Sequence, residues 1–553
     1  MDQNSAEQPM FILDEGSQRI TDGDAQSYNS RAAQAMANAV QSTLGPKGMD
    51  KRLIDAVGNF TITNDGVTIL RKMDIENPVA NLVVEVASTQ EREAGDGTTT
   101  AVTVTGDLLE NAEELIEKGV HPATIVRGFN RANDRARDEL DDIANAADGE
   151  SIRTQIAQTS MTGRTAETHQ ERLSDLLVDA VDAVTIETDD GDMFADVEYI
   201  RFETQDGRPI SRSELLEGAV LDADVLHENM PKSVDDARLL LVDTPIGIEE
   251  LAVETQLDVD DVAEIQDYVD KERSQVRDQV DRILTGDVDV VLCQKGIEPA
   301  AAQLLAKAGV VGVQQVSKED ISFIKNVLDA TIVSDPDEIT DDIVGHGDIW
   351  RDFDEEAYYI RSHAEGGHGV TLLLRGSTKQ VVDEIERSAE DTMDILALSV
   401  NDRRILPGGG ATEVELAGRL RDYADSVSGR EQLAVEVFAD ALETVPRTLA
   451  RNSGLDPIDS LIDLRTAHER GDVSAGLDVF TGGVVDTVES GVVEPVHAKK
   501  QVLDSATEAA NLVLRIDAII SAGDLSEILG QDEELREGGD PSDEISGGTG
   551  RPV

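Results

Sequence analysis

The stretch "GDGTTTAVTVTGDLLENAEELIEKG" (residues 95–119) joins a polar glycine turn to an amphipathic segment. In the second part, apolar residues recur every three or four positions, which predicts one face of a helix that ends at Gly119: Ala101, Val104, Leu108, Ala112 and Leu115. In the turn, an acid stands between two glycines and is followed by three threonines. The turn is either a phosphate cradle with its metal ligand or a polar cap of the helix, and these residues alone do not decide between the two.

Helical patterns continue on both sides of this stretch. Apolar periodicity predicts helices over residues 27–44, 77–93 and 122–147. An alternating pattern over residues 51–63 predicts a β-hairpin that turns at Val57-Gly58-Asn59. The first region of the chain is therefore predicted to be mostly helical.

The pattern changes after about residue 148. Short strand-like runs appear ("AVTIET", "ADVEYIRFE" and "ARLLLVD"), and an acidic region over residues 245–283 ends in a predicted long amphipathic helix. The runs "VDVVLCQKG" and "GVVGVQQV" flank another helix, and "GVTLLLRG" (residues 369–376) reads as a buried strand. Helices are then predicted over residues 381–398, 411–426, 431–452 and 500–514. This order predicts an α/β domain inserted into a helical one.

The composition is that of a large protein with buried cores. The 553 residues are enough for about three or four domains, and 39% of them are hydrophobic. No run approaches the ~20 apolar residues of a membrane helix, and the first residues, "MDQNSAEQPM", lack the pattern of a secretory signal. The single cysteine, Cys293, excludes an internal disulfide, so a cytoplasmic location with a reducing environment is expected.

The chain is strongly acidic, with 113 acids against 48 bases and a formal charge of -65. The acids are spread along the whole chain, and only 13 of the bases are lysines. Such a charge repels nucleic acids and anionic membranes, so neither is expected as a partner. An acidic, lysine-poor surface suits a cytoplasm rich in salt, and we therefore expect a halophilic source.

Three further glycine turns lie next to predicted elements. They are "TLGPKGMDK" (Thr43–Lys51), "NDGVTIL" (Asn64–Leu70) and "PGGGATEVE" (Pro407–Glu415). In the last of these, Thr412 and Glu415 have the spacing of a capping box. The chain contains no GxxxxGK[ST] motif, which excludes a Walker-type P-loop. Any one of these turns, taken alone, is better explained as a turn or cap than as a binding site.

Together the turns have complementary chemistry. Glycines let backbone N–H groups approach phosphates, and a helix N-terminus favours their negative charge. Mg²⁺ prefers a few carboxylates together with phosphate oxygens, and phosphoryl transfer to water needs a further carboxylate that orients the water. Asp65, Asp96 and Asp391 are candidates for these roles. Their spacing does not show that they meet, and Asp391 alone is better explained as a solvated helix acid.

Motifs spread over nearly the whole chain give a more specific signal. They are "ILDEGSQRITDGDAQ", "STLGPKGMDK", "NDGVTIL", "GDGTTTAV", "HPATIVRGF", "QTSMTG", "CQKGI", "GGGATEVELA", "SGREQLAVEVFADALETVPRTLARNSGLD", "GLDVFTG" and "GVVEP". Taken in order, they resemble the group II chaperonins of the TCP-1/cpn60 chaperonin family. The long block at residues 428–456 is highly specific, and "GPKGMDK" separates this group from the bacterial type.

The resemblance implies a multidomain α and α/β fold. It consists of a mostly helical equatorial domain, an α+β intermediate domain, and an inserted α/β apical domain with a helical protrusion that serves as a lid. By resemblance, the equatorial domain comprises residues 1–147 and 403–530, and the intermediate domain comprises residues 148–217 and 369–402. The apical domain comprises residues 218–368, with the protrusion at about 246–272. Residues 531–553 are expected to form a disordered acidic tail.

The resemblance also implies a nucleotide site that uses ATP and Mg²⁺, with K⁺ as a further candidate. Asp96 would bind Mg²⁺, Asp65 would lie by the γ-phosphate and water, and Asp391 would be the general base or water-positioning residue. On the phosphates, the contacts would be Gly97, Thr98, Thr99 and Thr100, with Arg164 as the γ-phosphate sensor, and both phosphates and base would contact Leu44, Gly45, Pro46 and Lys47. The ribose would contact Gly409 and Gly410, and its hydroxyls would contact Glu494. Gly476 would lie near the adenine.

Several positions depart from the family pattern. Arg164 stands where the family usually has lysine, which keeps the charge but changes the donor geometry. Ala389 and Glu390 replace a larger apolar residue and a His or Asn, residues 326–350 barely match, and the tail lacks the usual Met-containing repeats. These changes leave the expected ATPase chemistry nearly intact and affect the choice of client.

Two functions of different classes follow. The first is an ATP-dependent chaperone that encloses non-native proteins in two stacked rings of eight or nine subunits, built from this chain or its paralogues, and closes a lid by ATP hydrolysis. The second is a holding oligomer with a regulatory or weak ATPase. A metabolic kinase is a remote third possibility, because no acceptor-substrate site is visible. In the family, the hairpin around Gly58 pairs with terminal strands of a neighbouring subunit, which "LRIDAIIS" (residues 514–521) would supply.

Overall fold

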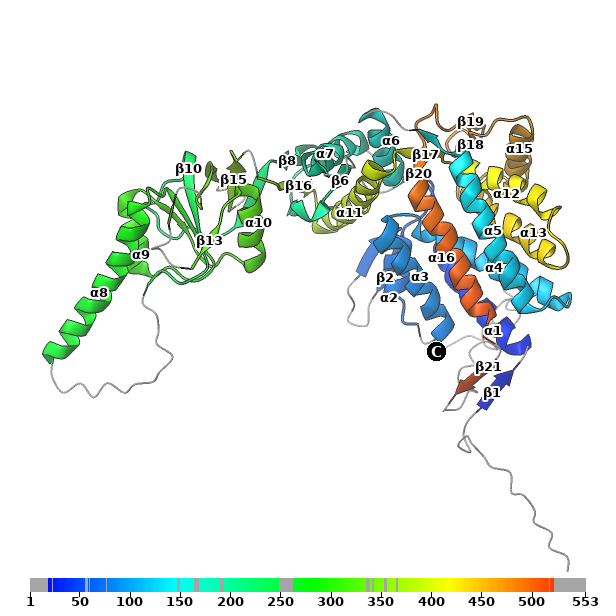
Figure 1. Ribbon diagram of the computed structural model, residues 1–553, viewed down its shortest axis with the longest axis horizontal. Helices are drawn as coiled ribbons and strands as arrows, with labels where there is room; N and C mark the ends of the chain where they lie inside the picture. The colour runs from blue at the N-terminus through cyan, green and yellow to red at the C-terminus, as the bar shows by residue number, and fades with distance from the viewer. Residues whose placement is uncertain are drawn as a thin grey trace, which may run out of the picture.

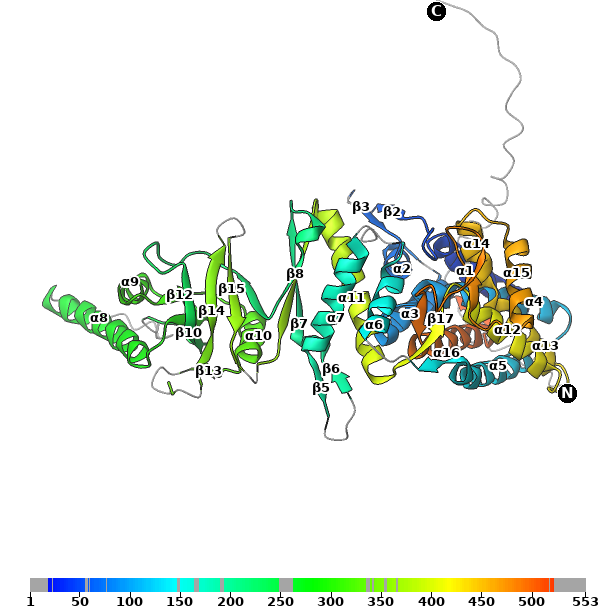
Figure 2. The same ribbon diagram turned by 90° about the horizontal axis from the view of Figure 1, so that it is seen from above.

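The computed structural model describes residues 18–521 with short gaps. The gaps are residues 22, 55–57, 59, 76, 147–149, 164–168, 189–192, 248–261, 335–338, 341–342, 353–355, 365–366 and 517. The described residues form three units (Figures 1 and 2), of which two have one buried core each and the third has a core on each face of its sheet. We call them the helical body (residues 18–146 and 404–521), the connecting unit (150–216 and 370–401) and the sheet unit (218–362).

The helical body is built from both ends of the chain. Its helices are α1 (Gly23–Gln41), α2 (Gly66–Lys72), α3 (Pro78–Ala94), α4 (Thr98–Glu117), α5 (Pro122–Ile143), α12 (Ala411–Ala424), α13 (Glu431–Leu442), α14 (Thr444–Asn452), α15 (Pro457–Glu469) and α16 (Val496–Leu514). The late helix α16 packs against α3, α4 and α5, so one core holds side chains from both segments (Figure 1).

Four small sheets lie around this core. They pair β1 (Gln18–Thr21) with β21 (Ala518–Ser521), β2 (Lys51–Ile54) with β3 (Phe60–Thr63), β17 (Arg404–Pro407) with β4 (Asn145–Ala146) and β20 (Val493–Pro495), and β18 (Ala475–Leu477) with β19 (Val484–Asp486). The predicted hairpin at residues 51–63 is confirmed as β2 and β3. The terminal strand β21 pairs antiparallel with β1 of the same chain, with Ile20 opposite Ile519.

The prediction of one helix over residues 431–452 is wrong. The structure ends α13 at Leu442 and starts α14 at Thr444. Pro446 accounts for the break, because it has no N–H to donate to the Leu442 carbonyl and its ring would crowd that carbonyl. The break turns Val445 and Leu449 to line the large cavity described below.

The connecting unit contains three helices and short strands. They are α6 (Glu150–Met161), α7 (Gln170–Ala183), α11 (Lys379–Asn401), β5 (Thr185–Glu187), β6 (Met193–Ala195), β7 (Ile200–Asp206), β8 (Glu214–Leu216) and β16 (Val370–Gly376), with 3₁₀ turns at Val197–Tyr199 and Ile210–Arg212. The strand β16 is buried along its whole length, as predicted, and pairs with β7 on one side and β8 on the other. The helices α6 and α7 were not among the predicted elements.

The sheet unit is a mixed sheet with helices on both faces. Its elements are β9 (Gly218–Asp222), β10 (Ser233–Val242), α8 (Val262–Thr285), β11 (Val290–Cys293), α9 (Pro299–Ala308), β12 (Val311–Val313), α10 (Lys318–Leu328), β13 (Ile332–Val333), β14 (Gly345–Asp352) and β15 (Ala357–Ser362). The strand order is β12-β11-β10-β14-β15-β9. Alternate residues point to opposite faces, so Leu239 and Leu241 join α10 in one core, while Leu240 and Val242 join α8 and α9 in another.

The three units follow one another along the molecule. The sheet unit and the helical body lie at opposite ends, and the connecting unit lies between them (Figure 2). The predicted fold class, multidomain α and α/β, is therefore confirmed. The predicted protrusion at residues 246–272 falls partly on residues 248–261, outside the described residues, while α8 begins at Val262. No described helix has the length and apolarity needed to cross a membrane.

Candidate functional site

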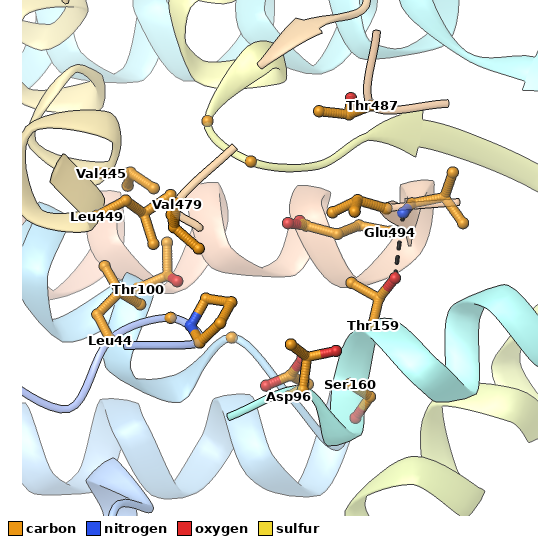
Figure 3. A pocket seen from close by; sticks show the side chains of 18 of the residues that line it. Leu44, Asp96, Thr100, Thr159, Ser160, Val445, Leu449, Val479, Thr487 and Glu494 are labelled. Carbon is orange, nitrogen blue, oxygen red and sulfur yellow. Dashed lines mark hydrogen bonds between the residues drawn. The ribbon is translucent and has the colours of Figure 1, made fainter. Parts of the chain in front are cut away.

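The helical body contains a cavity of about 580 Å³ where the predicted glycine turns meet (Figure 3). Turns that are far apart in the sequence supply its walls, and the end of α6 from the connecting unit closes one side. Twelve of the predicted site residues line it: Leu44, Gly45, Pro46, Asp65, Asp96, Gly97, Thr98, Thr99, Thr100, Gly409, Gly410 and Glu494. Four others, Lys47, Asp391, Gly476 and Arg164, are treated separately below.

The turn at residues 95–97 links two helices through left-handed glycines. Gly95 ends α3 with a φ of 67°, and Gly97 begins α4 with a φ of 79°. Gly97 has no side chain that could cap the helix, so the first N–H groups of α4 face the cavity without a side-chain acceptor from that position. A helix N-terminus of this kind favours an anion, which fits the phosphate-cradle interpretation better than the cap interpretation.

A buried glutamine supports the Asp96 backbone from behind. The Gln90 side-chain amide donates to the Asp96 carbonyl at 2.8 Å, and the Ser505 hydroxyl donates to the Gln90 side-chain oxygen at 3.2 Å. Gln90 is fully buried and lies on the apolar face of α3 with Val83 and Ala87. Gln90 was not among the predicted site residues, although a glutamine in the apolar stripe of a helix is a usable signal.

The loops at Asp65 and Gly163 meet the same end of the cavity. Asp65 caps α2, accepting from the Thr68 N–H at 2.7 Å. A Cβ on Gly66 would lie 2.5 Å from the Thr99 hydroxyl, so the Asp65 loop touches the start of α4. A Cβ on Gly163 would similarly lie 2.7 Å from the Pro46 Cα. The Asp65 loop thus contacts the start of α4, and the Gly163 loop contacts the turn at Pro46; Arg164 itself lies outside the described residues.

One side of the cavity is apolar. Leu44, Val445, Leu449 and Val479 gather there around Thr100 (Figure 3), and Leu477 and Phe480 also line the cavity. Lys47 does not line the cavity, because its ammonium lies over the Phe480 ring, 4.6 Å from the centroid. An apolar end next to a polar, N–H-rich end suits a flat heterocycle attached to a phosphate chain. The α14 contribution was missed because the sequence analysis had treated residues 431–452 as one helix.

The glycine turn before α12 forms a further wall. Gly409 and Gly410 line the cavity, and the Leu477 N–H donates to the Gly409 carbonyl at 2.9 Å. Gly476 lies behind this turn rather than in the cavity, since a Cβ there would be 2.8 Å from the Gly408 carbonyl oxygen. Its function is therefore to let the β18 strand approach the turn closely.

The predicted capping box at Thr412 and Glu415 is wrong. The residue that caps α12 is Gly410, and Thr412 lies inside the helix with its hydroxyl donating to the Pro407 carbonyl at 2.7 Å. Glu415 accepts from Arg419 and lies 2.8 Å from the His468 ring nitrogen. The helix begins two residues earlier than the box requires, because a left-handed glycine takes the cap position.

Asp391 lies outside the cavity wall, but its helix contacts the loop at residues 95–97. A Cβ on Gly95 would be 2.9 Å from the Asp391 carbonyl oxygen and 2.7 Å from the Asp394 Cβ. Ile395, one turn further along α11, lines the cavity. Two side-chain contacts join α11 to the other walls: the Thr392 hydroxyl donates to Ser160 at 3.2 Å, and the Arg387 guanidinium donates to the Thr63 hydroxyl at 3.3 Å.

Acids gather at this polar end. Burial raises the pKa of Glu91, and Asp65 adds to that rise against the opposing Arg71 charge. Burial and the charge of Glu390 also raise the pKa of Asp394. This concentration of negative charge favours a cation. Within the described residues, no three carboxylate, His or Cys groups are placed to hold a metal ion by themselves, so Asp96 would hold one only with oxygens from another molecule.

Glu494 is the acid on the far wall, and a buried lysine holds it. The Lys499 ammonium contacts the Glu494 carboxylate and lies 2.6 Å from the Glu413 carboxylate. Burial raises the pKa of Glu494, against the opposing Lys499 charge. Burial would lower the pKa of Lys499, but the charges of Glu413 and Glu494 outweigh it and raise that pKa instead. Neither Glu413 nor Lys499 was among the predicted site residues.

Comparison with known proteins gives relatives over almost the whole chain. A sequence model described as the TCP-1/cpn60 chaperonin family matches residues 36–524. The chain is 55% identical over 536 residues to thermosome subunit 2 of Haloferax volcanii, covering 97% of this chain and 96% of the relative. It is 52% identical over 523 residues to thermosome subunit beta of Halobacterium salinarum, covering 94% of each. It is also 44% identical over 522 residues to a thermosome subunit of Methanopyrus kandleri, covering 94% and 95%.

Proposed function

The chain belongs to the TCP-1/cpn60 chaperonin family as a group II chaperonin subunit, and from that premise we propose that it hydrolyses ATP to drive the folding of non-native proteins. The observation that carries this proposal is the contact between α11 and the loop at residues 95–97. The helix α11 belongs to the connecting unit and carries Asp391. It contacts the strongest candidate phosphate loop of the helical body. Two haloarchaeal relatives agree with the halophilic source expected from the charge.

The cavity residues fit a magnesium–nucleotide complex. The N–H groups at the start of α4 suit phosphate oxygens, and Asp96 supplies the hard oxygen ligand that Mg²⁺ prefers. The ion would neutralise charge that develops on the phosphate oxygens. The apolar end around Leu449 suits the base, and Glu494 suits the ribose hydroxyls. Lys47 and Gly476 are better described as supports of this site than as direct contacts.

We assign Asp391 and Asp65 to the hydrolysis step. Asp391 would accept a proton from the attacking water or orient that water, and Asp65 would fix the water on its other side. Asp391 is outside the cavity wall while its helix touches the loop, so a small movement of α11 would bring the carboxylate to the phosphate end. Hydrolysis would then depend on the relative position of the two units.

The remaining parts of the proposal concern architecture. We propose that the helical body, the connecting unit and the sheet unit are the equatorial, intermediate and apical domains, and that α8 leads from the protrusion that forms the lid. Subunits, identical or paralogous, would form two stacked rings of eight or nine in the cytoplasm and enclose non-native clients. ATP turnover moves the lid only if the nucleotide states bind the open and closed forms differently.

The substitution Asp391→Ala tests the catalytic part. We expect ATP binding to stay within about threefold of wild type while the turnover rate falls at least about 100-fold, because a positioned proton acceptor contributes about that much. Asp383→Asn is the matched control, since Asp383 lies eight residues earlier on the same helix. Calorimetric titration with ATP and phosphate release in single turnover would measure the two effects. Wild-type turnover in Asp391→Ala would rule out the assignment.

Refolding of a denatured client separates folding from holding. We expect a yield with ATP that is clearly higher than with a non-hydrolysable analogue, because enclosure would require turnover. Equal yields with both nucleotides would instead indicate a holding oligomer whose nucleotide site is regulatory. The Asp391→Ala variant should then behave like wild type in this assay, which gives an independent check.

A further inference from the structure

Lys499 lies almost completely buried between two carboxylates at the edge of the cavity. Its side chain is 6% exposed, that of Glu413 is 4% exposed and that of Glu494 is 33% exposed. A buried ammonium is costly unless it is paired, and one ammonium here serves two carboxylates. Glu494 and Lys499 both line the cavity, while Glu413 lies behind them. The group therefore connects the cavity surface with the protein interior.

The three side chains come from three elements that build the same wall. Glu413 is in the first turn of α12, directly after Gly409 and Gly410. Glu494 is the central residue of β20, where it pairs with Leu406 of β17. Lys499 is in the first turns of α16. Lys499 thus fixes the position of Glu494 relative to the glycine turn that also faces the cavity.

Helix electrostatics do not explain this lysine. A cation near a helix N-terminus meets the positive end of the helix dipole, so the start of α16 disfavours Lys499. The neighbouring Lys500 is more exposed, at 20%, and pairs with Asp141 on the surface. The position of Lys499 is therefore explained by its two carboxylate partners, and its removal would leave both without a counter-charge.

The charges that face Glu494 are unbalanced without Lys499. The groups that act on it are Lys499 from α16, Glu413 from α12 and Asp96 from the loop before α4. Glu494 and two of the three groups that act on it are acids. With Lys499 absent, Glu494 would take up a proton or turn to solvent, and either change removes a fixed anionic acceptor from the cavity wall.

We propose that Lys499 is a positioning residue that holds Glu494 as a fixed, ionised acceptor, so that the cavity selects ribonucleoside triphosphates over their 2′-deoxy analogues. The inference rests on the proposed ATP site. One Glu494 oxygen contacts Lys499, and within the described part of the chain the other has no hydrogen-bond partner, so it can accept hydrogen bonds from vicinal ribose hydroxyls. A site built to bind a hydroxyl loses affinity for the analogue that lacks it, because the buried acceptor is left unpaired.

The test compares binding of Mg-ATP and Mg-2′-deoxyATP to the full chain by calorimetric titration. We expect wild type to favour ATP by about tenfold or more. We expect Lys499→Met to bring the ratio of the two dissociation constants close to one, mainly by weakening ATP binding. Lys499→Arg, which keeps the charge, should restore part of the preference. Lys500→Met is the matched control, since it removes the next lysine of the same helix and its ion pair.

The outcomes separate this inference from the proposed function. A Lys499→Met protein that keeps the wild-type preference for ATP overturns the inference. An equal loss of affinity for both nucleotides also overturns it, because such a loss indicates a purely structural role of Lys499. If circular dichroism shows that Lys499→Met does not fold, Glu494→Gln gives the decision: a retained preference for ATP overturns the inference, and a lost preference supports it. Wild type that binds neither nucleotide contradicts the proposed function itself.

Discussion

Gly95 and Gly97 show how much of the site depends on single residues without side chains. Both have left-handed backbone, and they flank the acid that is proposed to hold the metal ion. A Cβ on Gly97 would lie 2.6 Å from a Val502 methyl group, inside the helical body. A Cβ on Gly95 would instead meet Asp391 and Asp394 of the connecting unit. Two neighbouring glycines thus adjoin two different units of the molecule.

Gly95→Ala should therefore uncouple binding from hydrolysis. The new methyl group would push α11 away from the loop, because the nearest obstacles are the Asp391 backbone and the Asp394 Cβ at 2.9 and 2.7 Å. We expect turnover to fall about tenfold or more, since misplacement of a catalytic group by about 1 Å costs up to about 100-fold, while ATP affinity changes little. Steady-state hydrolysis and calorimetric binding would measure both.

Gly119→Ala provides the control for backbone strain. Gly119 has a similar φ of 81°, and nothing lies within 4 Å of a Cβ placed there. Alanine at Gly119 should cost about 1 kcal/mol of stability through the left-handed conformation and leave turnover unchanged. Equal loss of turnover in both variants would contradict the steric explanation.

The acids and glycines of the site could be predicted from the sequence better than the residues that support them. Asp65 and Asp96 line one cavity, whereas Asp391 lies just outside it. The position of Asp391 depends on how α11 packs, and the sequence does not show that packing. Gln90 was missed although it stands in the apolar stripe of its helix, whereas Lys499 was missed because a buried lysine on a helix cannot be distinguished from a surface lysine without knowing its neighbours. Cavity-lining leucines and valines were missed for a related reason, since apolar residues carry no signal of which cavity they face.

At the scale of elements, α4 connects the cavity with the core of the helical body. It begins at the glycine loop, and its next turns pack against α1, α3, α13 and α16. Asp107 lies in the middle of this helix, where the Thr444 hydroxyl of α14 hydrogen-bonds to its carboxylate. Burial raises the pKa of Asp107 to about 6, with Glu110 adding to the rise and Arg447 opposing it. A charged Asp107 is therefore a local cost to stability at neutral pH.

This cost gives a pH dependence of known sign. Because the folded pKa of about 6 exceeds the ordinary value of 3.8, the folded state binds a proton between these values while the unfolded state does not. The contribution of Asp107 to stability therefore improves as the pH falls from 7 towards 4. Asp107→Asn should stabilise the helical body by about 2 kcal/mol at pH 7.5, and the gain should shrink at pH 5.

Thermal unfolding of wild type and Asp107→Asn at both pH values would check this prediction. Glu117→Gln serves as the control, since Glu117 is exposed at the end of the same helix and lies ten residues from Asp107. A difference between wild type and Asp107→Asn that is identical at pH 7.5 and pH 5 would contradict the assigned titration.

Element types were predicted well where the periodicity was long and less well where the backbone is interrupted. The helices α3, α4 and α5 lie where the apolar pattern predicts them, within a few residues at their ends. Residues 431–452 have one continuous apolar pattern, and the break before Pro446 was overlooked because the pattern continues across it. The helices α6 and α7 lie just before the strand-like runs that dominated the interpretation of this region.

At the scale of the whole molecule, the charge of -65 acts on all three units at once. Carboxylates cover the surface, and the described ion pairs use mainly arginine. Repulsion among so many like charges opposes the compact state, and it decreases when salt shortens the screening length from about 10 Å at 0.1 M to about 3 Å at 1 M. The chain should therefore be adapted to salt as a whole rather than at one site.

The thermal unfolding midpoint should rise with KCl concentration. Between 0.1 and 3 M KCl we expect an increase of roughly 10 °C or more, equivalent to a few kcal/mol for domains of this size. Sucrose is the control, because it strengthens the burial of apolar surface without screening charge. The same midpoint at both KCl concentrations would show that the acidic surface has no role in salt adaptation.

The order of helical and strand-like regions along the sequence predicted an α/β region inserted into a helical one. The inner sheet was predicted because β11 and β12 flank α9 in a strand–helix–strand pattern. The mixed pairing of β10, parallel to β11 and antiparallel to β14, could not be predicted, because periodicity gives a strand and its buried face but not its neighbour.

The shared core of the helical body also orders events during synthesis of the chain. The helices α4 and α5 leave the ribosome early, yet their partner α16 ends at Leu514, close to the end of the chain. At about 5–20 residues per second, the first helices wait for roughly 20 seconds or longer with their apolar faces uncovered. The sheet unit (218–362) is contiguous in the sequence and can close its own core first. A chaperonin subunit is thus itself a nascent chain that exposes apolar surface until its last helix emerges.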